Sequence, residues 1–146
     1  MGGKAPDYNK IYSDIWNSKD GKNWIQITDK APWGPRRAHN SVVFNDKIWI
    51  LGGVTKGEKY LNDVWFSSDG VNWTQVTDHA NWEPRKGFGT VVFDNKIWLM
   101  GGVSINGPEN DVWFSENGKD WNSVLSQAIW PGRHGHCLLT FKDYLL

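Results

Sequence analysis

Net charge, cysteine pairs and long apolar runs are all missing from this sequence of 146 residues. Its 16 Lys and Arg balance its 16 Asp and Glu, so no long-range field favours nucleic acid or an anionic membrane as a partner. The single cysteine, Cys137, excludes an intrachain disulfide and a CxxC metal site. No apolar run approaches the roughly 20 residues of a membrane span, and Met1 leads into Gly-Gly-Lys instead of a signal peptide. We expect a soluble protein, with a cytoplasmic location favoured.

Catalytic signatures are missing as well. The chain holds no G-x-S-x-G element, no phosphate-binding glycine loop and no H-E-x-x-H motif. The one spacing typical of a metal site is His134-Gly135-His136, because alternate residues of a strand point the same way. The sequence places no third ligand beside this pair. We therefore predict no catalytic residue, no metal site and no cofactor.

What the chain has in abundance is tryptophan, eleven in all, in four columns of a unit about forty-nine residues long. Self-similarity at this spacing is typical of propellers and repeat arrays. A Gly-Gly pair marks the same period, at Gly2-Gly3, Gly52-Gly53 and Gly101-Gly102. The columns are Trp16, Trp65 and Trp113; Trp24, Trp73 and Trp121; Trp33, Trp82 and Trp130; and Trp49 and Trp98, with Leu146 in the matching place.

Each repeat has the period-two pattern of strands and no helical stretch. In the middle copy we expect strands over 87–93, 96–100, 110–115 and 119–124, with a turn at Asp94-Asn95. The dipeptides Asp20-Gly21, Asp69-Gly70 and Asn117-Gly118 predict two-residue hairpins in all three copies. Four short antiparallel strands per repeat make one blade of a propeller.

These residues resemble the Kelch repeat. The matching segments are AHNSVVFNDKIWILGG at 38–53 and NDVWFSSDGVNW at 62–73, with PRR or PRK before the first strand. The resemblance covers essentially the whole chain, although Trp stands at several positions where the family more often has Tyr or another apolar residue. It implies an all-β, Kelch-type β-propeller with three four-stranded blades per chain.

The chain reads as one domain over 1–146, with blades at 38–76 and 87–124 and a third blade split between 1–28 and 135–146. Its second strand stops partway at the carboxyl end and resumes at the amino end. Because known propellers need roughly 4 to 8 blades to close, we predict a homodimer that forms one six-bladed ring. The rival interpretation is a fragment of a longer propeller. The residues predicted to join the two copies are Met1, Gly2, Gly3, Tyr144, Leu145 and Leu146.

Positions that recur in every copy are expected to build the framework. The tryptophans would pack blade against blade instead of stacking on a sugar. The carboxylates at Asp14, Asp63 and Asp111 would cap nearby backbone amides, and the guanidinium groups would tie down the loop before each first strand. Those guanidinium groups belong to Arg36, Arg85 and Arg133.

Function is expected where the copies differ, on loops around the channel mouth. In the Kelch adaptors that this chain resembles, basic residues just before the first strand grip acidic peptides. That resemblance implies a ligand site for a peptide or a small acidic molecule, with Arg offering bidentate contacts to carboxylates and Lys a point charge. The tentative site residues are Arg37, Lys86 and His134, followed two residues later by His39, Phe88 and His136.

Three functions stay open on the sequence. The first is a non-enzymatic interaction scaffold whose partners are a second copy and an acidic ligand. The second is a sugar-modifying or sugar-binding enzyme similar to Kelch-type mutarotases and oxidases, although no Tyr stands in a recognisable position to join Cys137 in a copper site. The third is a designed or evolutionary half-propeller with assembly as its only property.

Overall fold

The computed structural model describes residues 1–6 and 10–146, and every regular element in that part of the chain is a β-strand. The predicted all-β class with antiparallel sheets is therefore confirmed. The described residues contain no apolar helix long enough to cross a bilayer.

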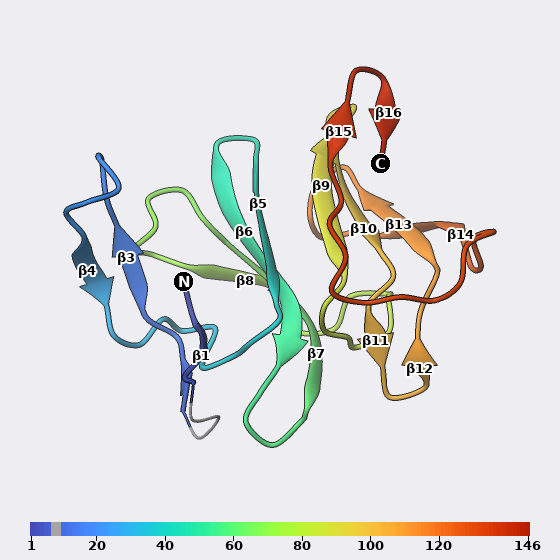
Figure 1. The fold of residues 1–146 in the computed structure, drawn as a ribbon. Helices are drawn as coiled ribbons and strands as arrows, with labels where there is room; N and C mark the ends of the chain where they lie inside the picture. Colours follow the sequence, from blue (N-terminus) through green and yellow to red (C-terminus); the bar gives the residue numbers. More distant parts are fainter. Residues whose placement is uncertain (7–9) are drawn as a thin grey trace.

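Two four-stranded antiparallel sheets occupy the middle of the molecule (Figure 1). Each runs in sequence order from an inner to an outer strand, so neighbouring strands are joined by hairpins and short loops. The first sheet consists of β5 (Asn40–Phe44), β6 (Lys47–Val54), β7 (Tyr60–Ser67) and β8 (Thr74–Thr77). The second consists of β9 (Gly89–Phe93), β10 (Lys96–Met100), β13 (Val112–Ser115) and β14 (Asn122–Leu125).

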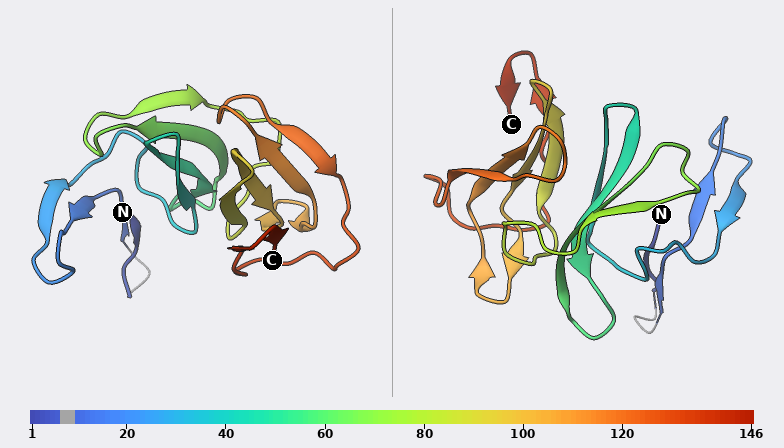
Figure 2. Two further views of the ribbon diagram at one scale, coloured as in Figure 1. Left: turned by 90° about the horizontal axis from the view of Figure 1, so that it is seen from above. Right: turned by 180° about the vertical axis from the view of Figure 1, so that it is seen from behind.

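Two-stranded sheets flank this pair. Seen from above, the sheets follow one another along an arc, and both ends of the chain lie on its open side (Figure 2). The short pairs are β1 (Gly3–Lys4) with β2 (Ile11–Tyr12), β3 (Ile15–Asn17) with β4 (Ile25–Thr28), β11 (Val103–Ser104) with β12 (Gly107–Pro108), and β15 (Thr140–Phe141) with β16 (Tyr144–Leu145).

The turns differ from the predicted ones in one respect. Asn45 and Asp46, with φ of 50° and 54°, form the left-handed two-residue turn between β5 and β6, and Asp94-Asn95 does the same between β9 and β10. The Asp-Gly and Asn-Gly dipeptides do not form such turns, because only their glycines have positive φ. Each lies in a longer loop between outer strands.

Side chains close these longer loops. The Ser18 hydroxyl accepts a hydrogen bond from the Gly21 amide at 2.8 Å, and the Asp20 carboxylate accepts from the amides of Asn23 at 2.8 Å and Lys22 at 2.9 Å. These bonds, led by the one from Asn23, hold the pKa of Asp20 well below its usual range. The Ser-x-(Asp/Asn)-Gly pattern therefore encodes a capped loop, which a reading of the dipeptide alone missed.

Tryptophans from different columns pack against one another within the core. Trp82 meets Trp121 edge-on, with ring centroids 5.9 Å apart, and Trp33 meets Trp73 in the same way at 6.1 Å. Edge-to-face pairs of this kind add about 0.5–1.5 kcal/mol to the burial of their surface. The core between the two four-stranded sheets also contains Phe44, Trp49, Leu51, Val64, Ala80, Phe88, Ile97 and Leu99.

Buried ion pairs join the loop before each inner strand to the third strand of the same sheet. The Arg36 guanidinium bonds both carboxylate oxygens of Asp63 at 2.8 Å. Arg85 bonds both oxygens of Asp111 at 2.5 and 2.7 Å, and it also donates to the Gly101 carbonyl. Asp63 and Asp111 thus pair with Arg36 and Arg85 instead of capping amides as predicted, because a buried guanidinium requires a carboxylate partner.

Removal of one such arginine is expected to destabilise the fold strongly. Arg85 is 0% exposed, so Arg85→Ala leaves the Asp111 carboxylate buried and unpaired, and we expect a loss of about 3–5 kcal/mol in the free energy of unfolding. Urea denaturation measures it. Lys96→Ala, which removes a surface pair to Asp94, is the control and is expected to cost less than about 1 kcal/mol. Equal losses in the two variants would contradict the role of the buried pair.

Candidate functional site

The Gly-Gly pairs lie in β6, at the start of β1 and directly after β10, where a ring from the following repeat comes close to the backbone. At the first glycine of each pair, φ is 60°, 48° and 60° for Gly2, Gly52 and Gly101. A Cβ at these glycines would lie 3.1–3.2 Å from a ring atom of the following repeat. The rings that occupy this space are, in order, those of His39, Phe88 and His136.

This packing decides which of the predicted site residues belong to the framework. Phe88 is 2% exposed and packs against Trp82 with ring centroids 5.9 Å apart. That position corrects its assignment to the channel mouth, since a buried core ring offers no surface to a ligand. His39 and His136 are half-buried in the equivalent positions.

The two histidines are kept neutral by their surroundings. Burial is the main cause that lowers the pKa of His39 to about 4, and the nearby Arg36 guanidinium and the N-terminal amine add to it, while Asp63 opposes it. Burial, followed by Arg133 and His134, lowers the pKa of His136. Their Nδ1 atoms are buried without a hydrogen-bond partner among the described residues.

Arg37, Lys86 and His134 lie one residue after the framework arginines. Arg37 exchanges two backbone hydrogen bonds of 3.0 Å with Val54, and Lys86 exchanges bonds of 3.1 and 2.9 Å with Val103. These bonds fix where each side chain leaves the backbone. His134 follows the same column and is exposed.

Hydrogen bonds between the loops bring the three positions into a row. The Gly87 amide donates to the Ala38 carbonyl at 2.9 Å, and the Gly135 amide donates to the Gly87 carbonyl at 2.7 Å. Since these residues directly follow Arg37, Lys86 and His134, side chains about forty-eight residues apart in the chain become neighbours.

The two cations of the row share one carboxylate. Glu58, in the loop between β6 and β7, binds the Arg37 guanidinium through one oxygen and the Lys86 ammonium through the other at 3.2 Å. The hydrogen bond from Lys86 is the main cause that lowers the pKa of Glu58. The Lys86 ammonium also lies 5.1 Å from the centroid of the Tyr60 ring. We define the basic row as Arg37, Lys86 and His134, with Glu58 as its internal counter-ion.

The sequence analysis did not identify Glu58. One signal was available, because it is the single acid in a loop that otherwise carries Lys56 and Lys59. The loops before the inner strands and the loop after β6 come together only in the folded chain. Within the described ranges, no three His, Cys, Asp or Glu side chains gather as a metal site would require.

A family model for the KLHDC2/KLHL20/DRC7 Kelch-repeats domain matches residues 1–146. The chain belongs to the Kelch-repeat family. This confirms the resemblance seen in the sequence and agrees with the arrangement of antiparallel sheets as a Kelch β-propeller. Kelch-repeat domains mediate protein–protein binding, and the family is generally of the non-enzymatic adaptor type. A search of curated proteins gave no match.

Replacement of His39 by phenylalanine, the residue of the next repeat, is expected to change the pH dependence of stability. The folded state keeps His39 neutral down to about pH 4, while the unfolded chain binds a proton near the usual pKa of 6.5. The unfolded state therefore holds more protons between these values, and stability falls as the pH drops from about 6.5 to about 4.

His39→Phe removes this contribution, which is on the order of 3 kcal/mol at most, because one pKa unit corresponds to about 1.4 kcal/mol. Urea midpoints at pH 7 and pH 4.5 measure it, and the difference between the two pH values is expected to shrink in the variant. His134→Gln, at an exposed histidine, is the control that retains the wild-type difference. An unchanged difference in His39→Phe would contradict the burial of a neutral imidazole.

Proposed function

We propose that this chain is a non-enzymatic interaction scaffold that binds an acidic ligand, such as a peptide carboxylate, at the basic row. One observation carries the proposal: Arg37 and Lys86, from consecutive repeats, converge on the two oxygens of a single carboxylate. A guanidinium beside an ammonium is well suited to a carboxylate, because charge-assisted hydrogen bonds are roughly twice as strong as neutral ones.

Glu58 supports the proposal in a second way, since it occupies the row as a ligand carboxylate would. Its own hold is weak, because its side chain is 58% exposed and water screens an ion pair at the surface. Its backbone has φ of 56°, a left-handed conformation that is uncommon outside glycine. An incoming carboxylate therefore competes with Glu58 for the row and displaces it by making stronger contacts. His134 extends the row and has no acidic partner among residues 1–6 and 10–146.

The sugar-modifying alternative receives no support from the geometry. Of the two histidines that such an enzyme would use, His136 lies against Gly89 and Gly101 between the sheets, and His134 is exposed. Four tryptophans of the second and third columns pair with each other in the core, Trp33 with Trp73 and Trp82 with Trp121.

Variants of the basic row are expected to change affinity for acidic peptides in opposite directions. Arg37→Ala and Lys86→Ala each remove a charge-assisted contact and are expected to weaken binding about 10-fold or more. Glu58→Gln removes the internal competitor and is expected to tighten binding a few-fold. Fluorescence anisotropy with a labelled Glu-rich octapeptide measures both. Lys119→Ala, on a distant loop, is the control. Weaker binding by Glu58→Gln, or unchanged binding by the two alanine variants, would contradict the site.

We also propose that three blades per chain close into a six-bladed ring with a second copy. The β15–β16 hairpin supports this, because its register Phe141↔Tyr144 repeats that of Phe93↔Lys96 between β9 and β10. Yet β16 is two residues long, and β1, which corresponds to the end of the same strand, lies in a separate two-stranded sheet. In the ring, Tyr144, Leu145 and Leu146 of one copy continue into Met1, Gly2 and Gly3 of the other.

Light scattering after size exclusion is expected to give about 33 kDa, twice the chain mass of 16.7 kDa. Leu145→Asp places a charge in the joining strand and is expected to yield a species near the mass of one chain. Val43→Asp, on an exposed strand position, is the control that keeps the larger mass. A wild-type protein that runs at the mass of one chain would contradict the ring.

A further inference from the structure

Arginine–aspartate pairs and tryptophan pairs each occur twice within the chain. In both cases the residues of a third pair lie at opposite ends of the chain. We infer that Arg133 of one copy forms a bidentate ion pair with Asp14 of a second copy, and that Trp24 of that second copy fills the apolar groove beside Trp130. This inference rests on the proposed ring and specifies the side chains that join the two copies. We call each of the two contacts between the copies a seam.

The ion pairs provide the first support. The columns match Arg36 with Asp63 and Arg85 with Asp111, and in both pairs a tryptophan two residues after the aspartate donates to the same carboxylate. Asp14 already accepts such a bond from Trp16 at 2.9 Å but has no arginine within the described part of the chain.

Arg133 is the matching half at the other end. It is exposed, and its one described side-chain hydrogen bond goes from Nε to the Pro131 carbonyl at 3.2 Å. Its backbone is already in the framework position, since its carbonyl accepts from the Gly102 amide as that of Arg85 accepts from Gly53. Asp14 of a second copy would supply the carboxylate that the buried arginines bind.

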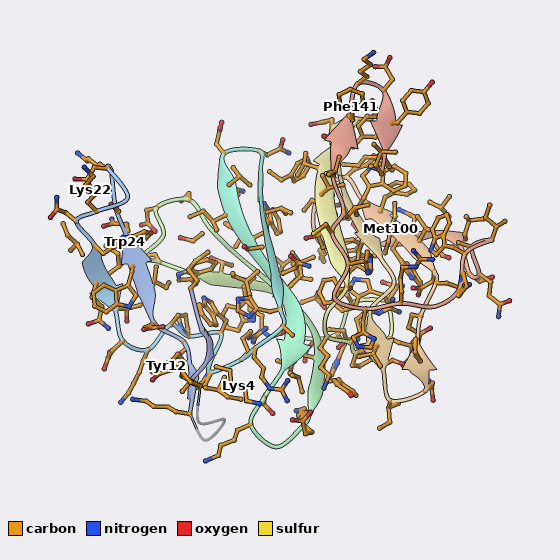
Figure 3. All side chains as sticks on the ribbon, viewed as in Figure 1. Lys4, Tyr12, Lys22, Trp24, Met100 and Phe141 are labelled. Carbon is orange, nitrogen blue, oxygen red and sulfur yellow. The ribbon has the colours of Figure 1, made fainter. Side chains whose placement is uncertain are left out.

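The tryptophans follow the same rule. The pairs Trp33–Trp73 and Trp82–Trp121 join the third column to the second, so Trp130 corresponds to Trp24. Trp24 is 57% exposed, whereas Trp121 is 5% exposed. In Figure 3, Trp24 lies on the β3–β4 hairpin at one end of the molecule, and Met100 lies in the sheet at the other end.

An open groove is present where the missing tryptophan would lie. It has a volume of about 410 Å³ and a mostly apolar lining next to Arg133. An equivalent cluster lies between the two four-stranded sheets, where Trp113 and Trp121 of the second sheet complete it. The residues of the groove that correspond to that cluster are Trp98, Met100, Val112, Trp130, His136 and Leu145.

Glycine contacts give independent support. A Cβ on Gly53 or Gly102 would lie 2.7 or 2.8 Å from the Cβ of His39 or Phe88 in its own sheet. Gly3 has a similar φ of 109°, yet no atom of the described residues lies within 4 Å of such a Cβ. The position that should face it belongs to the column of His136, which lies at the other end of the chain.

The loop glycines show the same gap. The ring of Trp49 covers Gly118 of the next sheet. Among the described residues, by contrast, no atom lies within 4 Å of a Cβ on Gly21, whose covering residue would be Trp98 of a second copy. A Cβ on Gly70, which would face Leu146 of a second copy, meets only Ile48 of its own sheet at 3.8 Å.

A second copy is the occupant that these features fit, because each end of the chain exposes what the other end lacks. A cation and a groove lie at one end, and a carboxylate and exposed tryptophans lie at the other. Two copies related by a two-fold axis satisfy both ends at once, with the same contacts at each seam.

A charge exchange tests the inference. In a dimer of Asp14→Arg, Arg133 of each copy faces the new arginine of the other copy. In a dimer of Arg133→Asp, Asp14 of each copy faces the new aspartate of the other. We expect each single variant to weaken the dimer by at least about 100-fold, since both seams lose a desolvated pair. An equimolar mixture of the two variants restores an opposite pair at both seams and is expected to recover the mass of a dimer. Analytical ultracentrifugation with one variant labelled measures it, and circular dichroism confirms that each variant is folded.

The outcomes separate this inference from the proposed ring. A wild-type dimer whose single variants remain dimeric, or whose folded variants do not associate when mixed, would overturn the Arg133–Asp14 pair and leave the ring intact. A wild-type monomer would overturn both. If a single variant fails to fold, Asp14→Asn and Arg133→Gln take its place, each with an expected weakening of the dimer at unchanged secondary structure.

Discussion

The buried arginine–aspartate pair is the interaction on which the arrangement of this chain depends. It ties the loop before each inner strand to the third strand of the same sheet, across 27 or 26 residues of sequence. The residue directly after each arginine is held by backbone bonds to its own sheet and faces its counterparts from the other repeats. A stabilising contact thus positions the side chain proposed to bind a ligand, without taking part in binding.

The repeats divide their positions between two tasks. Columns with one residue type make equivalent contacts in the two complete repeats, as the arginines do with Asp63 and Asp111 and as the paired tryptophans do with each other. Columns with several residue types divide further. At the position of Arg37, Lys86 and His134 the side chains reach the surface to different degrees, while at the position of His39, Phe88 and His136 they fill a gap of fixed shape beside a glycine. Residue type therefore varies between repeats for one of two reasons. Either different side chains fill the same space beside a glycine, or the side chain lies at the surface.

The sequence predicted the strand class, the turn at Asp94-Asn95 and the family, because these follow from local periodicity and from a repeated spacing. It failed where the deciding partner is remote in the chain. The carboxylate of Asp63 was expected to cap amides, since the sequence cannot show that the Arg36 guanidinium is buried beside it. Phe88 was assigned to the mouth because alternation fixes only its side of the strand, whereas its burial depends on Gly52 of the preceding repeat. Glu58 could not be assigned to the site, because its loop has no counterpart of similar sequence.

In the proposed ligand site, the carboxylate of Glu58 would affect selectivity. Because Glu58 belongs to the same chain, its carboxylate competes with a ligand at an effective concentration in the millimolar range. A ligand would stay bound only if its own contacts outweighed this competition. Simple monovalent acids present at lower levels would be rejected, and acceptance would require several simultaneous contacts along the row, including one to His134. A single residue at the tip of a loop would thereby set an affinity threshold that favours extended acidic chains over small metabolites.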